Sequence, residues 1–228
     1  MIREQEIAAR VAEVGRRIAA AAARSGRAKE SVRLVAVGKT HPLSDLLLAY
    51  AAGVRAFGEN RVQEAEEKFP HLPVDAERHL IGPIQSNKAN RAVKIAAVIE
   101  TVDSLELARR LDRAAAAAGK RATVLVQVRL GGEATKSGVE PDAAAALVES
   151  VKALPALELE GLMTIPPPGD TRPHFAALRR LGETLSLREL SMGMSDDFEA
   201  AVEEGATIVR VGSAIFGERE GKKENLRR

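Results

Sequence analysis

The chain has 228 residues, of which 45% are hydrophobic and 3% aromatic, and its 34 Lys and Arg nearly balance its 32 Asp and Glu. That length suits one domain with a sizeable core and is short for two. The lack of Cys excludes a disulfide scaffold, a thiol nucleophile and a Cys-ligated metal site. The few aromatic rings and a formal net charge of +2 argue against nucleic-acid binding.

Residues 1–26 predict an amphipathic helix. They carry too many charges for the apolar region of a signal peptide, and no stretch approaches the roughly 20 apolar residues of a membrane span. Apolar side chains recur at a spacing of three and four residues, at Ile7, Val11, Val14, Ile18 and Ala22. We therefore expect a soluble, cytoplasmic protein.

Short β-rich runs alternate with helical stretches after residue 30. Strands are expected at 33–38, 54–58, 78–81, 98–102, 123–128, 157–162, 189–192 and 207–211, and helices at 44–52, 61–68, 86–94, 104–118, 142–153, 172–184 and 196–204. This alternation implies right-handed crossovers and a parallel α/β sheet. Eight such units favour a single (β/α)8 TIM-type barrel with an extra N-terminal helix, so that residues 1–228 form one domain. An open, doubly wound sheet would predict a glycine-rich dinucleotide motif after the first strand, which residues 38–42 (GKTHP) lack.

Lys39 is the clearest candidate site residue, because it ends the first predicted strand and the C-terminal ends of the strands form the active face of such a barrel. It shares a strand face with Val35 and Val37, which directs it toward the barrel mouth. Desolvation there lowers the pKa of an amine and allows it to form an imine. The alternatives are a solvated lysine and a lysine paired with Glu59.

The loops after the last two predicted strands resemble a phosphate site. They read SMGMS from Ser191 and GSA from Gly212 and Ser213, and small residues let backbone N–H groups close on phosphate oxygens. Ordinary tight turns use the same residue types. A lysine opposite a phosphate site suggests pyridoxal 5′-phosphate (PLP) as the ligand.

Arg210 shares a strand face with Gly212. A guanidinium against the pyridine nitrogen of PLP would keep that nitrogen unprotonated. The alternative for Arg210 is a salt bridge to Glu59.

Seven motifs carry a family resemblance: residues 34–42 (LVAVGKTHP), 57–64 (FGENRVQE), 79–90 (HLIGPIQSNKAN), 136–138 (KSG), 161–166 (GLMTIP), 190–198 (LSMGMSDDF) and 209–219 (VRVGSAIFGER). Through them the chain resembles the YggS/PROSC family of pyridoxal phosphate homeostasis proteins, which are similar to the N-terminal barrel of bacterial alanine racemase. The resemblance implies a Schiff base between PLP and Lys39. It implies phosphate contacts from Ser191 and the Gly212–Ser213 backbone, Arg210 at the pyridine nitrogen, and Asn60 in the pocket wall. Gly38 departs from the pattern, since many members have Ser there.

The resemblance implies a protein that holds and delivers PLP, with no established turnover and no catalytic residue. The alternative is a PLP-dependent amino-acid racemase, which needs an acid/base group on each face of the substrate. In related racemases a tyrosine of a second domain supplies one of them. The chain has only Tyr50, which we expect near the opposite pole, although His79 could substitute. A third hypothesis is a Schiff-base aldolase that acts on a sugar phosphate without PLP.

The remaining candidates are weaker. The four histidines, His41, His71, His79 and His174, show no metal-ligand spacing, so no metal is expected. Asp196 and Asp197 are interpreted as helix-capping residues, and Lys136 as a solvated loop charge or an auxiliary phosphate or second PLP contact. A closed barrel has no free sheet edge, which favours a monomer. Expected partners are PLP and, transiently, PLP-dependent apoenzymes, with neither nucleic acid nor membrane.

Overall fold

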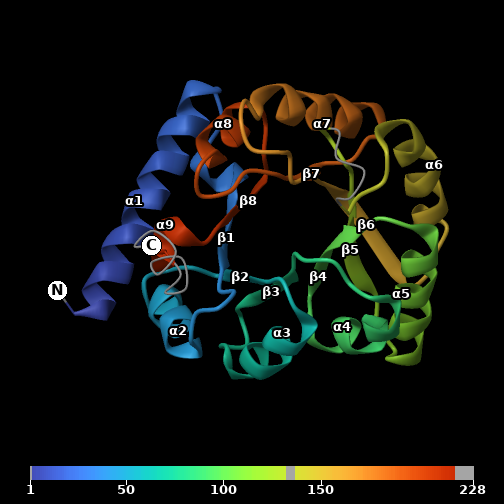
Figure 1. The fold of residues 1–228 in the computed structure, drawn as a ribbon, viewed down its shortest axis with the longest axis horizontal. Coiled ribbons are helices and arrows are strands. Elements are labelled where there is room, and N and C mark those ends of the chain that lie inside the picture. Colours follow the sequence, from blue (N-terminus) through green and yellow to red (C-terminus); the bar gives the residue numbers. More distant parts are fainter. Residues whose placement is uncertain (1, 132–136, 219–228) are drawn as a thin grey trace, which may run out of the picture.

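The computed structural model describes residues 2–131 and 137–218. Within these ranges parallel strands β1 to β8 close into a barrel in sequential order, with β8 paired to β1. Figure 1 shows the helices forming a ring around the strands. The predicted (β/α)8 barrel is confirmed. Lys136 lies outside the described residues.

All of the predicted strands are present, with ends within two residues of those expected. They are β1 (Arg33–Val37), β2 (Ala56–Glu59), β3 (Glu77–Leu80), β4 (Val98–Val102), β5 (Ala122–Gln127), β6 (Leu157–Met163), β7 (Glu189–Ser191) and β8 (Ile208–Val211). β2 begins later than predicted because the amide of Val54 donates to the carbonyl of Ala49 and so completes the preceding helix.

The helices that follow the strands also lie where they were predicted. They are α2 (Leu43–Ala51), α3 (Val62–Lys68), α4 (Ala89–Ile95), α5 (Leu105–Ala117), α6 (Pro141–Lys152), α7 (Arg172–Thr184) and α8 (Phe198–Glu203), and an unpredicted single turn, α9 (Ser213–Phe216), follows β8. α4 is preceded by a 3₁₀ turn at Ser86–Lys88. The predicted capping of α8 by acidic side chains is wrong, because the Asp197 carboxylate accepts from the amide of Met194, before the helix, at 2.7 Å.

Helix α1 (Arg3–Arg24) lies outside the ring and packs against α2, α8 and α9 (Figure 1). Its buried residues include the predicted apolar face, from Ile7 to Ala22. Ion pairs from Arg17 to Glu199 and from Arg24 to Glu203, each at 2.6 Å, attach it to α8. The helix thus covers the seam where the first and last strands meet. In the described ranges no helix is both long and apolar enough to span a bilayer.

The apolar core has two parts, as alternation along each strand requires. The larger part lies between strands and helices and includes Phe57, Ile99 and Leu162. The smaller part consists of Val35, Ala56, Leu125, Met163 and Ile208. Burial of each large apolar side chain contributes on the order of 2 kcal/mol. The second cluster includes Val35, whose register partner on β8 is the buried Arg210, so apolar and charged side chains meet at the centre of the barrel.

Candidate functional site

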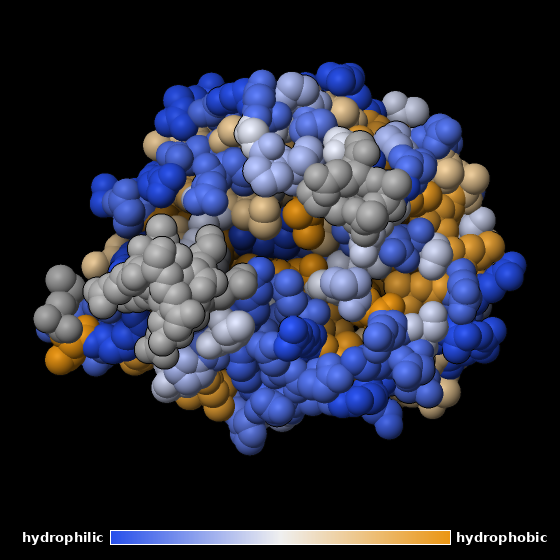
Figure 2. Space-filling model, in the orientation of Figure 1, coloured by the Kyte–Doolittle hydropathy of each residue, from blue (hydrophilic) through white to orange (hydrophobic). Residues whose placement is uncertain are grey.

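A cavity of about 200 Å³ opens at the C-terminal ends of the strands, and we call it the barrel-mouth cavity. Figure 2 shows the molecular surface hollowed near the middle of the ring, with mostly hydrophilic residues around the hollow. The lining residues are Val37, Lys39, His41, Asn60, Ile81, Ile165, Met194, Ser195, Asp196, Arg210, Gly212, Ser213 and Gly217. Five of the six predicted binding residues are therefore brought together, and Ser191 is the exception.

Lys39 reaches the cavity because the chain continues alongside β2 for one residue after β1 ends. The amide of Gly38 donates to the carbonyl of Gly58 at 3.0 Å, and both Val37 and Lys39 line the cavity. Glu59, the alternative partner considered for Lys39, instead accepts from Lys68 Nζ at 2.8 Å. Lys39 is half-buried, so its side chain is partly shielded from water.

Arg210 projects from β8 into the barrel interior and is 3% exposed. Its Nη1 donates to Ser191 Oγ at 2.6 Å, and its Nη2 donates to the carbonyl of Thr164 at 2.8 Å. Glu100 lies 3.9 Å away and supplies the opposite charge, which replaces the salt bridge to Glu59 that was weighed from the sequence. Burial lowers the pKa of Arg210, and the charge of Glu100 offsets only part of this effect. A guanidinium nevertheless remains a cation in proteins, and its two hydrogen bonds fix its position.

Ser191 is fully buried and its hydroxyl is already engaged inside the barrel. Oγ accepts from Arg210 and donates to Glu100 Oε2 at 2.5 Å. Among the described lining residues of the cavity Ser191 is absent, so the phosphate contact expected from it has no support in the geometry. Ser191 reaches the cavity only through the arginine that it helps to hold.

Ser195, in the loop that follows β7, lines the cavity where Ser191 was expected. Its Oγ accepts from the amides of Gly212 and Ala214 at 3.2 and 3.3 Å. These amides therefore converge on one point at the cavity wall, and convergent N–H groups favour an anion. The signal in the sequence was the run of small residues after the seventh strand, which contains both serines.

A buried chain of polar groups continues from Arg210 through the barrel. His79 Nδ1 lies 2.6 Å from Glu100 Oε1, and His79 Nε2 lies 3.1 Å from Glu77 Oε2. Burial alone would lower the pKa of His79, but the hydrogen bonds and charges of Glu100 and Glu77 outweigh it and raise the pKa to about 9. Burial would raise the pKa of Glu100, but His79 and Arg210 hold it below its ordinary value. Glu100 was missed from the sequence, where its only signal is a carboxylate in the apolar run 98–102 (VIETV).

Neither residue considered as a second acid/base group for racemisation lines the cavity in the described part of the chain. His79 is fully buried beneath Glu100. Tyr50 Oη donates to Asp75, which precedes β3, at 2.6 Å. Tyr50 therefore lies at the pole opposite Lys39, as expected.

Asn60 is held at the cavity wall by a close backbone approach. A Cβ atom on Gly82 would lie 2.2 Å from the carbonyl oxygen of Asn60. Only glycine fits at this position without a clash. Thr101 Oγ1 donates to the carbonyl of Gly82 at 2.9 Å. The loops after β2 and β3 are thereby locked against each other next to the cavity.

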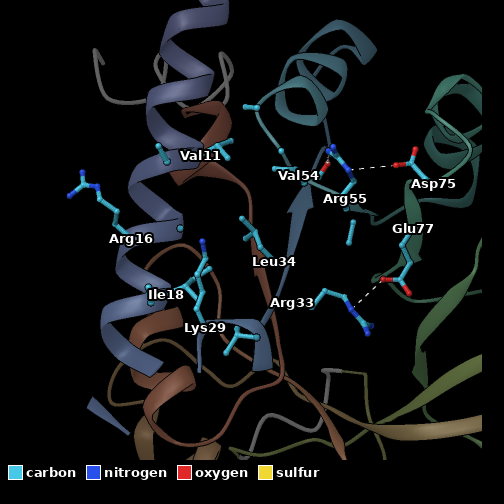
Figure 3. Close-up of a pocket in the computed structure, with 17 residues that line it drawn as sticks. Val11, Arg16, Ile18, Lys29, Arg33, Leu34, Val54, Arg55, Asp75 and Glu77 are labelled. Atoms are coloured by element: carbon cyan, nitrogen blue, oxygen red, sulfur yellow. Dashed lines mark hydrogen bonds and ion pairs between the residues drawn. The ribbon is translucent and has the colours of Figure 1, made fainter. Parts of the chain in front are cut away.

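A larger cavity, of about 750 Å³, lies at the opposite pole between α1 and the N-terminal ends of β1 and β2. Figure 3 shows its apolar wall, which includes Val11, Ile18, Leu34 and Val54, with charged residues around it. Arg33 pairs with Glu77 at 3.4 Å and Arg55 with Asp75 at 3.6 Å. We call it the α1 cavity. It contains none of the predicted binding residues, and this pole of a (β/α)8 barrel ordinarily serves stability.

Comparison with known proteins agrees with this geometry. Residues 12–220 match the model of the alanine racemase N-terminal domain. The pyridoxal phosphate homeostasis protein of Pseudomonas aeruginosa is 46% identical over 223 residues, which cover 94% of this chain and 96% of that protein.

The chain belongs to the family of pyridoxal phosphate homeostasis proteins. The resemblance expected from the motifs is confirmed. The family member of Aquifex aeolicus is 42% identical over 221 residues, covering 92% of this chain and 97% of that protein. The structure of PipY from Synechococcus elongatus with PLP bound has a TM-score of 0.79 and 41% identity, covering 92% of this chain and all of that one.

Proposed function

We propose that this protein binds PLP in the barrel-mouth cavity and holds it on Lys39 as part of intracellular PLP homeostasis, without turnover. The observation that carries the proposal is that Lys39, Arg210 and the Gly212–Ser213 loop line one cavity. Membership of the family and the PLP-bound structure of a relative at 41% identity support the same ligand.

The donor set fits PLP group by group. PLP carries an aldehyde, a pyridine nitrogen and a phosphate. The matching groups of a protein are an amine for the aldehyde, a hydrogen-bond partner for the nitrogen and a cluster of hydrogen-bond donors for the phosphate. Lys39 offers the amine, Arg210 a fixed N–H donor, and the amides near Ser195 the cluster. Val37, Ile81 and Ile165 give the cavity apolar walls for the ring.

The residues of this chain then have distinct tasks. Lys39 would hold PLP at the aldehyde carbon through its side-chain amine. Arg210 can donate but not accept, and its two fixed contacts keep it from turning away. Bound PLP supplies an electron-withdrawing ring, which is weaker when the pyridine nitrogen stays unprotonated. Such a site suits retention of the cofactor better than chemistry at Cα.

The absorption spectrum with added PLP, before and after borohydride, tests the proposal. We expect a yellow protein, loss of the chromophore on reduction, and a single labelled peptide that contains Lys39. Lys39→Ala should remain colourless, whereas the control Lys29→Ala, in the α1 cavity, should behave like the unaltered protein. A protein that stays colourless, or a label on another lysine, would contradict the proposal.

One observation favours examining racemase activity as the second candidate. His41 lines the cavity and its Nδ1 lies 3.7 Å from Asp45, so an imidazole is present near the lysine. Proton exchange at Cα of amino acids in deuterated buffer separates the two functions. Steady exchange that is abolished in both Lys39→Ala and His41→Ala would establish turnover, and the holder proposal predicts none.

Four finer statements complete the proposal. Residues 1–228 form one PLP-binding domain, the protein is a cytoplasmic monomer, and it contacts PLP-dependent apoenzymes transiently when it delivers the cofactor. Light scattering with and without PLP tests the monomer. Transfer of PLP to an apoenzyme across a dialysis membrane, compared with transfer in one compartment, tests whether delivery requires contact.

A further inference from the structure

Lys68 is a buried lysine to which the proposed function assigns no role. It projects from α3 and is 9% exposed. Its Nζ donates to the carbonyl of Gly38 at 2.9 Å and to Glu59 Oε1 at 2.8 Å, and Glu64 Oε2 lies 3.5 Å away. Gly38 is the residue immediately before Lys39, so a buried cation is bound directly to the turn that carries the proposed PLP lysine.

A second charged group binds the other side of the same turn. The amide of Thr40, immediately after Lys39, donates to Glu64 Oε2 at 3.1 Å. Thr40 has a φ of 68°, a left-handed conformation that residues other than glycine rarely adopt. The amide of His41 closes the turn on the Gly38 carbonyl at 3.0 Å. The peptide groups on both sides of Lys39 are therefore fixed by side chains of α3.

The third member of the group, Glu59, lies on the outer face of the barrel wall. It follows Gly58, whose added Cβ would meet the inward-facing Val35, and successive strand residues face opposite sides. Glu59 is fully buried, and a Cβ on Gly38 would lie 3.0 Å from its Oε1 and 2.8 Å from a methyl group of Leu46. The carboxylate thus packs against the backbone of the turn with no side chain between them.

The buried carboxylate of Glu59 depends on the positive charge of Lys68. Burial raises the pKa of Glu59 to about 7 even though Lys68 lowers it. A buried carboxylate without its cation is costly, so Lys68 is held in place by Glu59 and Glu64 together. The cation in turn can hold the Gly38 carbonyl.

We propose that Glu59, Glu64 and Lys68 are positioning residues for Lys39: they bind the carbonyl before it and the amide after it, and keep its amine directed into the barrel-mouth cavity. The inference rests on the proposed function, since it assigns Lys39 as the amine that meets PLP. None of the three side chains lines the cavity among the described residues, so they act through the backbone of the turn.

Glu64 gives the sharpest test, because it is half-buried and its removal leaves the Lys68–Glu59 pair intact. In Glu64→Ala, without PLP, we expect the Thr40 amide to exchange with solvent about tenfold faster, which is the loss expected when a hydrogen bond to a charged group is removed. PLP affinity and the rate of Lys39 imine formation should fall by a similar factor. Glu64→Gln keeps a carbonyl oxygen as acceptor and should restore both, and Glu67→Ala, an exposed acidic residue on the same helix, should change neither.

A second variant tests the Lys68–Glu59 pair without leaving an unpaired buried charge. Glu59→Gln combined with Lys68→Met removes both charges and leaves the Gly38 carbonyl without its ammonium donor. We expect a folded protein by circular dichroism, with slower imine formation and faster exchange of the His41 amide. Unchanged exchange and imine formation in this variant and in Glu64→Ala would overturn the inference. Failure of borohydride to label Lys39 in the unaltered protein would instead overturn the proposed function.

Discussion

The two cavities of the barrel differ in how their charged groups are held. In the barrel-mouth cavity Arg210 is 3% exposed and has fixed partners on two other strands or loops. In the α1 cavity, which is larger, the side chains of Arg33 and Arg55 are 40% and 54% exposed and pair with Glu77 and Asp75. Arg55 also donates to the carbonyls of Tyr50 and Val54, each at 2.9 Å, so the two cavities differ in the burial of their arginines and not in the number of partners. Exposed pairs contribute little energy because water screens them. Burial of charged groups therefore distinguishes the proposed binding site, and cavity volume does not.

A line of polar side chains nevertheless connects the two cavities. Glu77 meets Arg33 on the rim of the α1 cavity and His79 inside the barrel, at 3.4 and 3.1 Å. From His79 the chain continues through Glu100 and Ser191 to Arg210. The exposed fraction of the side chains drops from 40% at Arg33 and 34% at Glu77 to 0% at His79 and Glu100. Charged side chains are therefore solvated at the α1 cavity and buried with fixed partners near the barrel-mouth cavity.

Glu100→Ala should produce the largest effect. It removes the carboxylate that balances Arg210 and His79, and breaking a buried charged network costs about 3–5 kcal/mol. Urea unfolding measures the free energy of unfolding. The control Glu158→Ala removes a carboxylate 3.9 Å from Arg121 that is half exposed, and it should cost less than about 1 kcal/mol. An equal loss in the free energy of unfolding in the two variants would contradict the proposed difference between buried and exposed charged groups.

Ser191, at the end of β7, and Ser195, in the loop that follows, should be separable by comparing PLP with pyridoxal, which lacks the phosphate. Ser195→Ala should weaken PLP binding about fivefold, the effect of one hydrogen bond, and leave pyridoxal binding unchanged. Ser191→Ala should weaken the binding of both ligands, because it loosens Arg210. If Ser191→Ala affected PLP alone, the serine would contact phosphate and its place in the buried chain would need revision.

His79 should make stability depend on pH in a defined window. Its pKa rises from an ordinary 6.5 to about 9 on folding, so its stabilising contribution is complete below pH 6.5 and is lost as the pH rises toward 9. The pKa of Glu59 is raised from 4.5 to about 7 on folding. Its contribution to the stability of the protein is therefore lost as the pH rises from 4.5 to 7. The melting temperature should therefore fall between pH 7 and 9. In His79→Gln this fall should be much smaller; an unchanged slope would show that His79 is not the titrating group.

The smallest effects are expected in the α1 cavity. Arg55→Ala removes an exposed ion pair with Asp75 and the hydrogen bonds to the carbonyls of Tyr50 and Val54. Because Arg55 is more than half exposed and water can replace these partners, the free energy of unfolding should change by about 1 kcal/mol or less. PLP affinity and the imine spectrum should not change. Arg33→Ala is more informative, because Arg33 contacts Glu77 and through it His79. A tenfold loss of PLP affinity in either variant would mean that the two cavities are not independent.

The order of elements and most of the site could be predicted because they depend on local patterns. Strand and helix periodicity fixed the register, and that register placed Lys39 and Arg210 on inward-facing positions. The helix cap at Ser104 was also predictable, since its Oγ accepts from Leu107 three residues later.

The remaining features depend on contacts between distant segments. Ser191 ends β7 inside the barrel, whereas Ser195 lies in the loop beyond Gly193, whose φ of 89° turns the chain. Which of the two serines lines the cavity therefore depends on the path of that loop. The sequence suggested Glu59 as a partner for Lys39 or Arg210, because no motif marks the competing Lys68, which is the last residue of α3. Glu100 and Glu64 acquire their roles only when β4 meets β3 and when α3 packs beneath the turn after β1.

Closure of the barrel between β1 and β8 also sets the order in which the site can appear during synthesis. Lys39 leaves the ribosome early, whereas Arg210 and Gly212 are among the last described residues, and α1 reaches across to them through the Arg3 contact with the Phe216 carbonyl at 2.9 Å. Contacts so far apart in sequence form late in folding. A nascent chain therefore exposes the lysine long before the groups that would surround a bound cofactor.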